Sequence, residues 1–173
     1  MRAGGVIAYP TEAVYGLGCL PDDAAAVRRV QALKRRSARK GMLLVAADLA
    51  QIERYVRLPP EPRRSEVLAS WPGPVTWVLE ARPGAPRYMG GRSGTIAVRL
   101  TAHDATRALC RAARSALVST SANLSGRPPA RTALGVRRSL GRRVDYVLAG
   151  PLGGLRKPTT IRDGRTGAVL RGG

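Results

Sequence analysis

The sequence has few of the residues from which small proteins build metal sites, disulfides and hydrolytic triads. It contains two cysteines, one histidine and no phenylalanine among its 173 residues. Cys19 and Cys110 lie far apart and form no CxxC pair, so neither a disulfide framework nor a structural zinc site is expected. We expect both cysteines to be small buried residues. The single histidine, His103, argues against a Ser-His-Asp arrangement.

Long apolar runs are also absent. No stretch of about 18 apolar residues occurs, and the sequence therefore predicts no transmembrane helix. Met1 and Arg2 lead directly into Gly4 and Gly5 without the apolar segment of a signal peptide. Together with the unpaired cysteines, these features predict a cytoplasmic protein. A chain of 173 residues predicts a single domain over residues 1–173.

Acidic residues are scarce. The chain carries 30 lysines and arginines against 11 aspartates and glutamates, a formal net charge of +19. Such an excess favours anionic partners, either nucleotides or RNA. Only three of the basic residues are lysines, Lys34, Lys40 and Lys157. Biased coding accounts for arginine in place of lysine, so a retained lysine marks either chance or a position that needs a compact ammonium.

Apolar and polar segments alternate along the chain without a strict repeat. Strands are predicted over residues 6–9, 42–47, 75–79, 95–100, 116–119, 144–148, 160–161 and 168–170. Helices are predicted over residues 23–33, 49–56, 64–70, 103–114 and 132–140, with Asp22 and Asp48 as N-caps of the first two. The Gly- and Pro-rich stretch 82–94 predicts a surface loop. These interleaved elements predict an α/β fold with a mixed parallel and antiparallel sheet flanked by helices.

Three polar segments stand between the apolar elements, at residues 9–13, 34–41 and 119–126. Loops at strand ends are where α/β proteins assemble binding sites. The cations of the second segment suit a polyphosphate, and the hydroxyls and amide of the third suit phosphate or sugar oxygens. Each segment alone is better explained as a helix end or a turn than as part of a binding site. The common nucleotide and esterase signatures GxxxxGK[ST], GxGxxG and GxSxG are absent from the chain.

Six short blocks together resemble the YrdC-like family, in the family's order. They are Tyr9-Pro10-Thr11-Glu12, Tyr15-Gly16-Leu17-Gly18, Lys34-x-Arg36, Trp71-Pro72-Gly73-Pro74-Val75-Thr76, Ala97-Val98-Arg99 and Ser121-x-Asn123. The likeness extends from about Gly5 to Gly172 and is to the short bacterial form, which has no added C-terminal domain. Six ordered blocks over nearly the whole chain make an accidental similarity untenable.

The resemblance implies a twisted, mixed α/β sheet with a concave, positively charged groove. It also implies the family's reaction, the synthesis of L-threonylcarbamoyladenylate from L-threonine, bicarbonate and ATP with release of pyrophosphate. ATP is then a substrate, with Mg²⁺ expected on its phosphates and no metal ligand assigned to the protein. The product is passed to a transfer complex that modifies adenosine 37 of tRNAs reading codons that begin with A. Direct contact with tRNA or structured RNA is a further expectation, and no contact with a membrane is expected.

The family's functional residues are carried over by position. Catalytic roles fall to Lys34, Arg36, Ser121 and Asn123, and ATP contacts to Arg36, Lys40, Thr95, Ser121 and Arg171. Contacts with the amino acid or carbamate fall to Thr11, Ala13, Val45, Arg99, Ser119 and Thr159, with Arg99 pairing with the threonine carboxylate. Glu12 and Asp163 are expected to be solvated or to cap a turn rather than to touch metal-bound water.

The chain departs from the family pattern at several points. Family members often carry about a helix's length of chain before the first strand, and this sequence has none. Ser37 stands where proline is frequent, Thr159 where serine is usual and Pro129 where serine is frequent. Thr159 therefore keeps the hydroxyl and adds a methyl group, whereas Pro129 offers ATP no side-chain hydroxyl.

Two other functions are consistent with the sequence. A non-catalytic RNA-binding module fits the charge and the basic stretch 131–143, although 4% aromatic residues are few for stacking on single strands. Backbone contact with structured RNA is compatible with this composition. Carbamoyl transfer from carbamoyl phosphate is the other alternative, because related domains occur in hydrogenase-maturation proteins. Those proteins are longer and carry zinc-finger cysteines, which this chain lacks, and dependence of the product on threonine separates the two enzymes.

Overall fold

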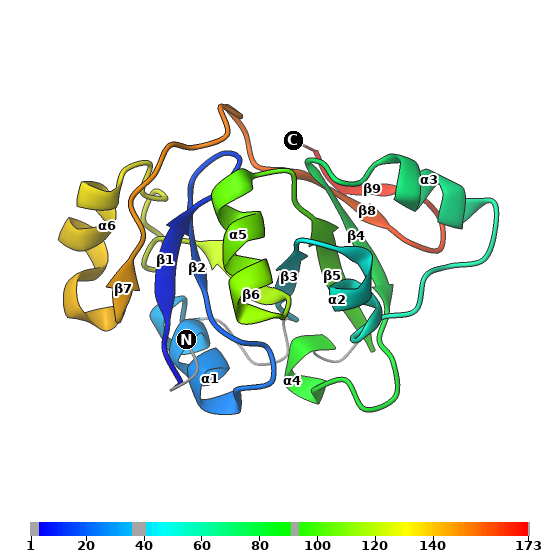
Figure 1. Cartoon of the computed structure of the whole chain (residues 1–173), viewed down its shortest axis with the longest axis horizontal. Helices are drawn as coiled ribbons and strands as arrows, with labels where there is room; N and C mark the ends of the chain where they lie inside the picture. Colours follow the sequence, from blue (N-terminus) through cyan, green and yellow to red (C-terminus); the bar gives the residue numbers. More distant parts are fainter. Residues whose placement is uncertain (1–3, 36–40, 91–93, 173) are drawn as a thin grey trace.

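The chain is organised around one strongly twisted sheet, shown in Figure 1. The computed structural model describes residues 4–35, 41–90 and 94–172. The strands within these ranges are β1 (Ile7–Pro10), β2 (Tyr15–Gly18), β3 (Leu43–Ala46), β4 (Val75–Glu80), β5 (Thr95–Leu100), β6 (Leu117–Ser121), β7 (Tyr146–Val147), β8 (Thr160–Asp163) and β9 (Val169–Arg171). Their order across the sheet is β7-β1-β2-β6-β3-β5-β4-β8-β9.

Parallel and antiparallel pairs alternate irregularly across this sheet. β1 with β7, β3 with β5 and β4 with β8 are parallel, and the other neighbours are antiparallel. The predicted mixed sheet is therefore confirmed. β6 lies between β2 and β3, which places Ser121 opposite Gly16 and Ser119 opposite Leu43. Residues about a hundred positions apart in the sequence thus become neighbours at the centre of the molecule.

Helices connect the strands and cover parts of the sheet. They are α1 (Ala24–Leu33), α2 (Leu49–Glu53), α3 (Arg63–Ala69), α4 (Arg87–Gly90), α5 (Asp104–Ala113) and α6 (Ala133–Leu140), followed by the 3₁₀ turn η1 (Gly141–Arg143). In Figure 1, α5 crosses in front of the centre of the sheet, α6 lies beside β7, and α3 lies at the opposite end near β9. None of these helices, within the part of the chain that is described, is long and apolar enough to cross a bilayer.

The N-cap of α1 is Asp23, one residue later than predicted. Its carboxylate accepts a hydrogen bond from the Ala26 backbone N–H at 2.9 Å, which satisfies one of the free donors of the first turn. Asp22 instead accepts a hydrogen bond from the Tyr55 hydroxyl and pairs with Arg54. Two adjacent aspartates fit the cap pattern equally well, and only the tertiary contact of Asp22 separates them.

Strand β2 was not predicted. Its sequence, Tyr15-Gly16-Leu17-Gly18, contains two glycines and therefore indicates a turn. All four residues are buried, because the strand lies between β1 and β6. A Cβ atom at Gly18 would lie 2.5 Å from the Val118 carbonyl oxygen and 2.7 Å from the Tyr9 ring. Glycine is therefore required there by close packing of neighbouring strands.

The loop predicted over residues 82–94 is partly wrong. It contains the one-turn helix α4, and Met89 and Gly90 of that helix are buried. The Met89 carbonyl oxygen accepts a hydrogen bond from the Met42 backbone N–H at 2.8 Å, so α4 is bonded to the residue that precedes β3.

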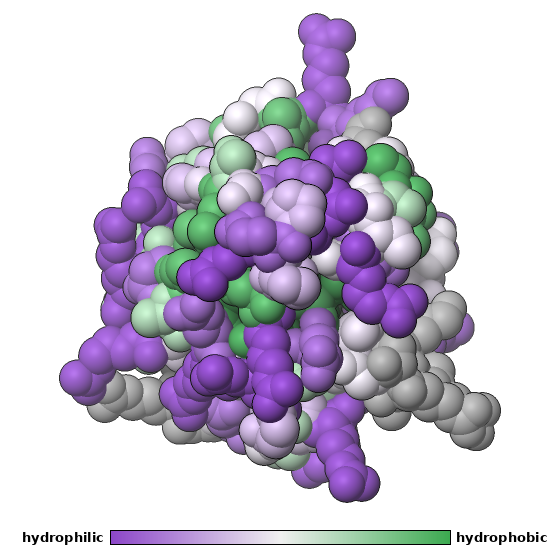
Figure 2. Space-filling model, turned by 90° about the vertical axis from the view of Figure 1, so that its right-hand side faces the viewer, coloured by the Kyte–Doolittle hydropathy of each residue, from purple (hydrophilic) through white to green (hydrophobic). Residues whose placement is uncertain are grey.

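Figure 2 shows the right-hand side of Figure 1, where hydrophilic side chains project over the surface with hydrophobic residues between them. Leu68, Val169 and Leu170 are among the exposed apolar residues.

One face of the central strands is only partly covered. Val45 and Leu117 pack against Cys110 of α5. Leu43 and Ser119 lie two residues away on the same strands and line a cavity, although Leu43 also packs against this cluster. Because alternate residues of a strand share a face, α5 covers one part of this face and the cavity occupies the part beside it.

Candidate functional site

A cavity of about 390 Å³ lies over the centre of the sheet. Its walls come from the β1–β2 connection, the end of α1, the start of β3, the middle and end of β5, the end of β6 and the C-terminal segment. Of the predicted site residues, the cavity is lined by Thr11, Ala13, Lys34, Arg99, Ser119, Ser121, Thr159 and Arg171. All three polar segments of the sequence therefore contribute to one cavity.

Lys34 joins two of these segments. Its ammonium donates to the Ser121 carbonyl oxygen at 2.9 Å, to Ser121 Oγ at 3.2 Å and to the Asn123 carbonyl oxygen at 3.0 Å. It also donates to Asn123 Oδ1, which accepts a further hydrogen bond from Ser121 Oγ at 2.7 Å. The predicted meeting of Lys34 with Ser121 and Asn123 is confirmed. An ammonium held among oxygen atoms at a cavity wall is a fixed positive charge for an anionic ligand.

Asn123 also shapes the loop that follows β6. Its amide nitrogen donates to the carbonyl oxygens of Leu124 and Arg127. The Ala122 N–H and the Ala130 N–H close this segment with hydrogen bonds to Tyr15 and Ala122, at 2.7 and 3.0 Å. The side-chain amide therefore holds the loop in the conformation in which its oxygens reach Lys34.

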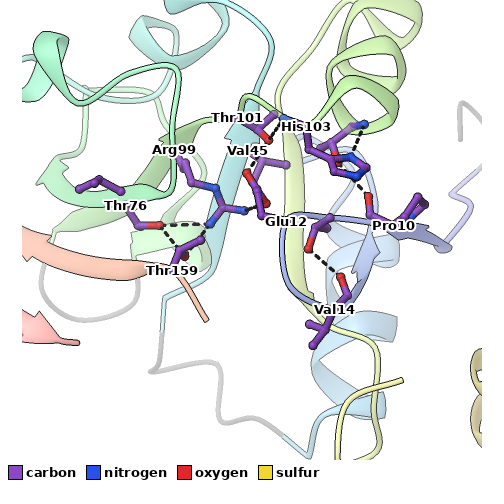
Figure 3. A network of polar contacts seen from close by, with 12 residues as sticks. Pro10, Glu12, Val14, Val45, Thr76, Arg99, Thr101, His103 and Thr159 are labelled. Carbon is purple, nitrogen blue, oxygen red and sulfur yellow. Dashed lines mark hydrogen bonds and ion pairs between the residues drawn. The ribbon is translucent and has the colours of Figure 1, made fainter. Parts of the chain in front are cut away.

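Arg99 forms the floor of the cavity together with a carboxylate that the sequence did not indicate (Figure 3). Its Nη2 pairs with Glu12 Oε2 at 3.0 Å, and its Nη1 donates to Thr159 Oγ1 at 2.9 Å and to Thr76 Oγ1 at 3.3 Å. The two charged side chains are only 6% and 8% exposed. The expectation that Glu12 is solvated or caps a turn is wrong, since its carboxylate is the buried counterion of Arg99.

Arg171 approaches the same cavity from β9. Its Nη2 donates to the Thr159 carbonyl oxygen at 2.9 Å, whereas Arg99 uses the hydroxyl of that threonine. Burial lowers the pKa of the Arg171 guanidinium, and the neighbouring charge of Arg99 lowers it further. Two guanidinium groups on either side of one residue provide a site for an anion between them.

Asp163 lies at the end of β8, away from the cavity lining. Its carboxylate accepts backbone hydrogen bonds from Thr166 and Arg165, which hold its pKa below the ordinary value. Hydrogen bonds of 2.7 and 3.0 Å make it the cap of the β8–β9 turn. The capping role expected for Asp163 is confirmed.

Several predicted site residues lie elsewhere. Val45 is fully buried beneath α5, where its carbonyl oxygen accepts a weak hydrogen bond from Cys110. Thr95 begins β5 and Asn123 follows β6, and the side chains that line the cavity within the described ranges do not include these three residues. Arg36 and Lys40 fall outside the described residues, and their roles stay predictions.

The thiols and carboxylates of the described residues do not form a metal centre or an activated nucleophile. No group of three or more histidines, cysteines, aspartates or glutamates comes together there. Cys19 and Cys110 are buried, and burial raises the pKa of each thiol to about 12. Both cysteines are therefore protonated at neutral pH and unreactive.

The fold and cavity define an α/β protein with a polar cavity, lined by lysine and arginine side chains, over an open part of its sheet. The chain belongs to the Sua5/YciO/YrdC family, whose profile, described as telomere recombination, matches residues 1–173. A relative from Halorhodospira halophila, named threonylcarbamoyl-AMP synthase, is 55% identical over 99% of this chain and 90% of its own length. One of the same name from Stenotrophomonas maltophilia is 56% identical over 99% and 93%.

A solved structure supports the same assignment. The crystal structure of P. abyssi Sua5 complexed with L-threonine matches with a TM-score of 0.86 at 31% identity. The match covers 94% of this chain and 48% of that protein, so this chain spans about half the length of that relative. The fold predicted from the sequence blocks is the fold observed.

Proposed function

We infer that this chain is a threonylcarbamoyl-AMP synthase, which makes L-threonylcarbamoyladenylate from L-threonine, bicarbonate and ATP. Relatives that it matches over nearly their whole length bear this name, and the P. abyssi structure holds L-threonine. The observation that carries the proposal is the contact of Lys34 with Ser121 and Asn123 in the cavity that also holds Arg99. Lys34, as the cation for the phosphates, and Arg99, as the cation for the substrate carboxylate, then line the same cavity.

The reaction needs two bond-forming steps. The uncharged amine of threonine adds to bicarbonate, which forms a carbamate and releases water. A carbamate oxygen then attacks the α-phosphorus of ATP, and the bond to the β,γ-phosphates breaks to release pyrophosphate. Buried, protonated thiols and the lack of a His-activated hydroxyl in the cavity lining favour direct attack over a covalent enzyme intermediate.

Catalysis then rests on positioning and on positive charge near the phosphates. Lys34 stabilises the charge that develops on the α-phosphate and its leaving group, held in place by Ser121 and Asn123. The roles proposed for Arg36 and Lys40 are also contacts with the triphosphate. Thr95, Ser121 and Arg171 contact the nucleotide. In this proposal Lys34 and Arg171 supply positive charge on the ATP side of the cavity.

The amino acid occupies the Arg99 side. Its carboxylate pairs with Arg99, while Thr11, Ala13, Ser119 and Thr159 surround the side chain and the carbamate; Val45, buried beneath α5, makes no such contact. Thr159 keeps the hydroxyl that the family usually supplies from serine, and that hydroxyl already accepts from Arg99 at 2.9 Å. A threonine at this position therefore supports Arg99 as a serine does.

Mg²⁺ belongs with the phosphates of ATP rather than with protein ligands. Among the described residues that line the cavity, Glu12 is the carboxylate, and it is bound by Arg99 and Thr101. A neutralised carboxylate is a poor ligand for a hard cation. The ion supplies further positive charge to the triphosphate when ATP binds.

The product is consumed by a separate complex that transfers threonylcarbamoyl to adenosine 37 of tRNA. The enzyme acts where its tRNA is made and used, in the cytoplasm. The net charge of +19 supports transient contact with tRNA, whose phosphates attract a basic surface.

Mass analysis of the product tests this function. Incubation of the purified chain with ATP, threonine and bicarbonate yields threonylcarbamoyl-AMP and pyrophosphate, and neither forms when threonine is left out. A product that forms from carbamoyl phosphate without threonine supports the carbamoyl-transfer alternative instead. RNA binding that weakens with salt and is unaccompanied by ATP turnover would leave only the RNA-binding module.

A further inference from the structure

Glu12 lies at the floor of the cavity, and both of its carboxylate oxygens accept hydrogen bonds, as Figure 3 shows. Its Oε2 accepts from Arg99 Nη2 at 3.0 Å and its Oε1 accepts from the Thr101 hydroxyl at 2.6 Å. Thr101 Oγ1 in turn accepts the backbone N–H of His103 at 3.1 Å. The carboxylate therefore joins the β1–β2 connection to the end of β5 and the start of α5.

The backbone of Glu12 is held as firmly as its side chain. The Leu155 N–H donates to the Glu12 carbonyl oxygen at 2.9 Å, and the Gly153 N–H donates to the Thr11 carbonyl oxygen at 3.0 Å. A Cβ atom at Gly153 would lie 2.9 Å from Glu12 Cα, so the segment that leads from β7 to β8 packs directly on this residue. Fixed on both sides, Glu12 presents its carboxylate in one position.

Arg99 depends on these partners for its orientation. A guanidinium has five N–H groups, and those with partners in the described part of the chain are taken by Glu12, Thr76 and Thr159. The buried Nε of Arg99 has no partner there. A long, flexible side chain with such a charge needs a counterion to stay at the cavity floor in a single orientation.

We propose that Glu12 is the positioning residue for the amino-acid substrate, because it fixes the guanidinium of Arg99 for the substrate carboxylate. The proposal rests on the function inferred above, in which Arg99 binds threonine. Glu12 is not a base in this scheme, since both carboxylate oxygens already accept hydrogen bonds from a cation and a hydroxyl. It also neutralises the positive charge of Arg99 at the cavity floor.

The variant Glu12→Gln keeps the shape of the side chain and removes its charge. We expect the KM for threonine to rise about 10- to 100-fold, because a misplaced binding group weakens substrate positioning to that extent. The KM for ATP stays within about twofold, since the phosphate contacts are separate. The pH profile of kcat/KM for threonine keeps its shape and is displaced downward, whereas loss of a catalytic base would remove its acidic limb.

Glu12→Asp separates orientation from charge. It keeps a counterion for the buried guanidinium, and with it most of the stability, but its shorter side chain no longer reaches Nη2. The KM for threonine therefore rises in this variant as well, even if Glu12→Gln fails to fold. The matched control is Asp145→Asn, which breaks the Arg29–Asp145 ion pair outside the cavity and leaves both KM values unchanged.

The outcomes distinguish this proposal from the proposed function. If the wild-type chain makes threonylcarbamoyl-AMP and folded Glu12→Asp or Glu12→Gln has the wild-type KM for threonine, Glu12 has only a structural role. An equal rise in the KM values for threonine and ATP also overturns the positioning role. If the wild-type chain makes no product, the proposed function fails first.

Discussion

At the scale of single residues, the site is built from charges whose partners are fixed by distant parts of the chain. A lysine retained in an arginine-rich protein indicated either chance or a position that needs an ammonium, and Lys34 contacts the Ser121–Asn123 segment. Glu12 gave no such signal. It belongs to a polar segment between two strands, and that pattern describes a solvated turn as well as a buried ion pair. Glu12 is a buried ion-pair partner rather than a solvated turn residue because it pairs with Arg99, which lies 87 positions away in the sequence.

Asp145 is a residue whose contribution to stability is expected to depend on pH. Its carboxylate accepts from Arg29 at 2.9 and 3.0 Å and from the Val6 N–H at 2.7 Å. The Arg29 hydrogen bond and then the Val6 N–H lower its pKa below the ordinary 3.8. The unfolded chain therefore binds the proton first as the pH falls, so the stabilisation is complete above the ordinary pKa and is lost as the pH passes through the lowered one.

We expect Asp145→Asn to lower the free energy of unfolding by about 1 kcal/mol at pH 7, because the pair is half exposed and its energy is screened. The difference between variant and wild type is smaller in acid, at a pH below the ordinary pKa of 3.8. Urea unfolding at the two pH values measures it. A difference of the same size at both values would show that the charge of Asp145 contributes nothing.

At the scale of elements, the sequence predicted those whose patterns are local. The strand over residues 95–100 is present where expected and the helix after Asp48 begins where expected, although it ends at Glu53 rather than at Val56; a cap or an apolar run specifies the start of each of them. β2 was missed because its glycines are explained only by the strands on either side of it. The helix α4 was missed entirely, because Met89 is held by a contact with the residue before β3 rather than by a periodic pattern of its own.

The close packing of β2 provides a test at this scale. Gly18→Ala places a methyl group 2.5 Å from the Val118 carbonyl oxygen, and we expect it to lower the free energy of unfolding by about 1–3 kcal/mol through overpacking. Gly172→Ala is the matched control, because nothing lies within 4 Å of the added atom. Denaturant unfolding of both variants measures the difference. Equal stabilities would mean that β1, β2 and β6 are not packed as described.

At the scale of the whole molecule, the order of the strands creates the site. β6 lies between β2 and β3. This order brings the polar segments at residues 9–13 and 119–126 to the same cavity. The sequence predicted this convergence only through the resemblance of six ordered blocks, since no local pattern relates residue 34 to residue 121.

The central claim is that Lys34 acts on ATP at this junction of distant segments. Pyrophosphate release with ATP, threonine and bicarbonate tests it most directly in Lys34→Ala, with Arg28→Ala as a control on the same helix outside the cavity lining. We expect Lys34→Ala to lower kcat about 100- to 1,000-fold, the effect of removing one charge-stabilising group, and Arg28→Ala to stay within about twofold of wild type. Wild-type pyrophosphate release by a folded Lys34→Ala would contradict the account.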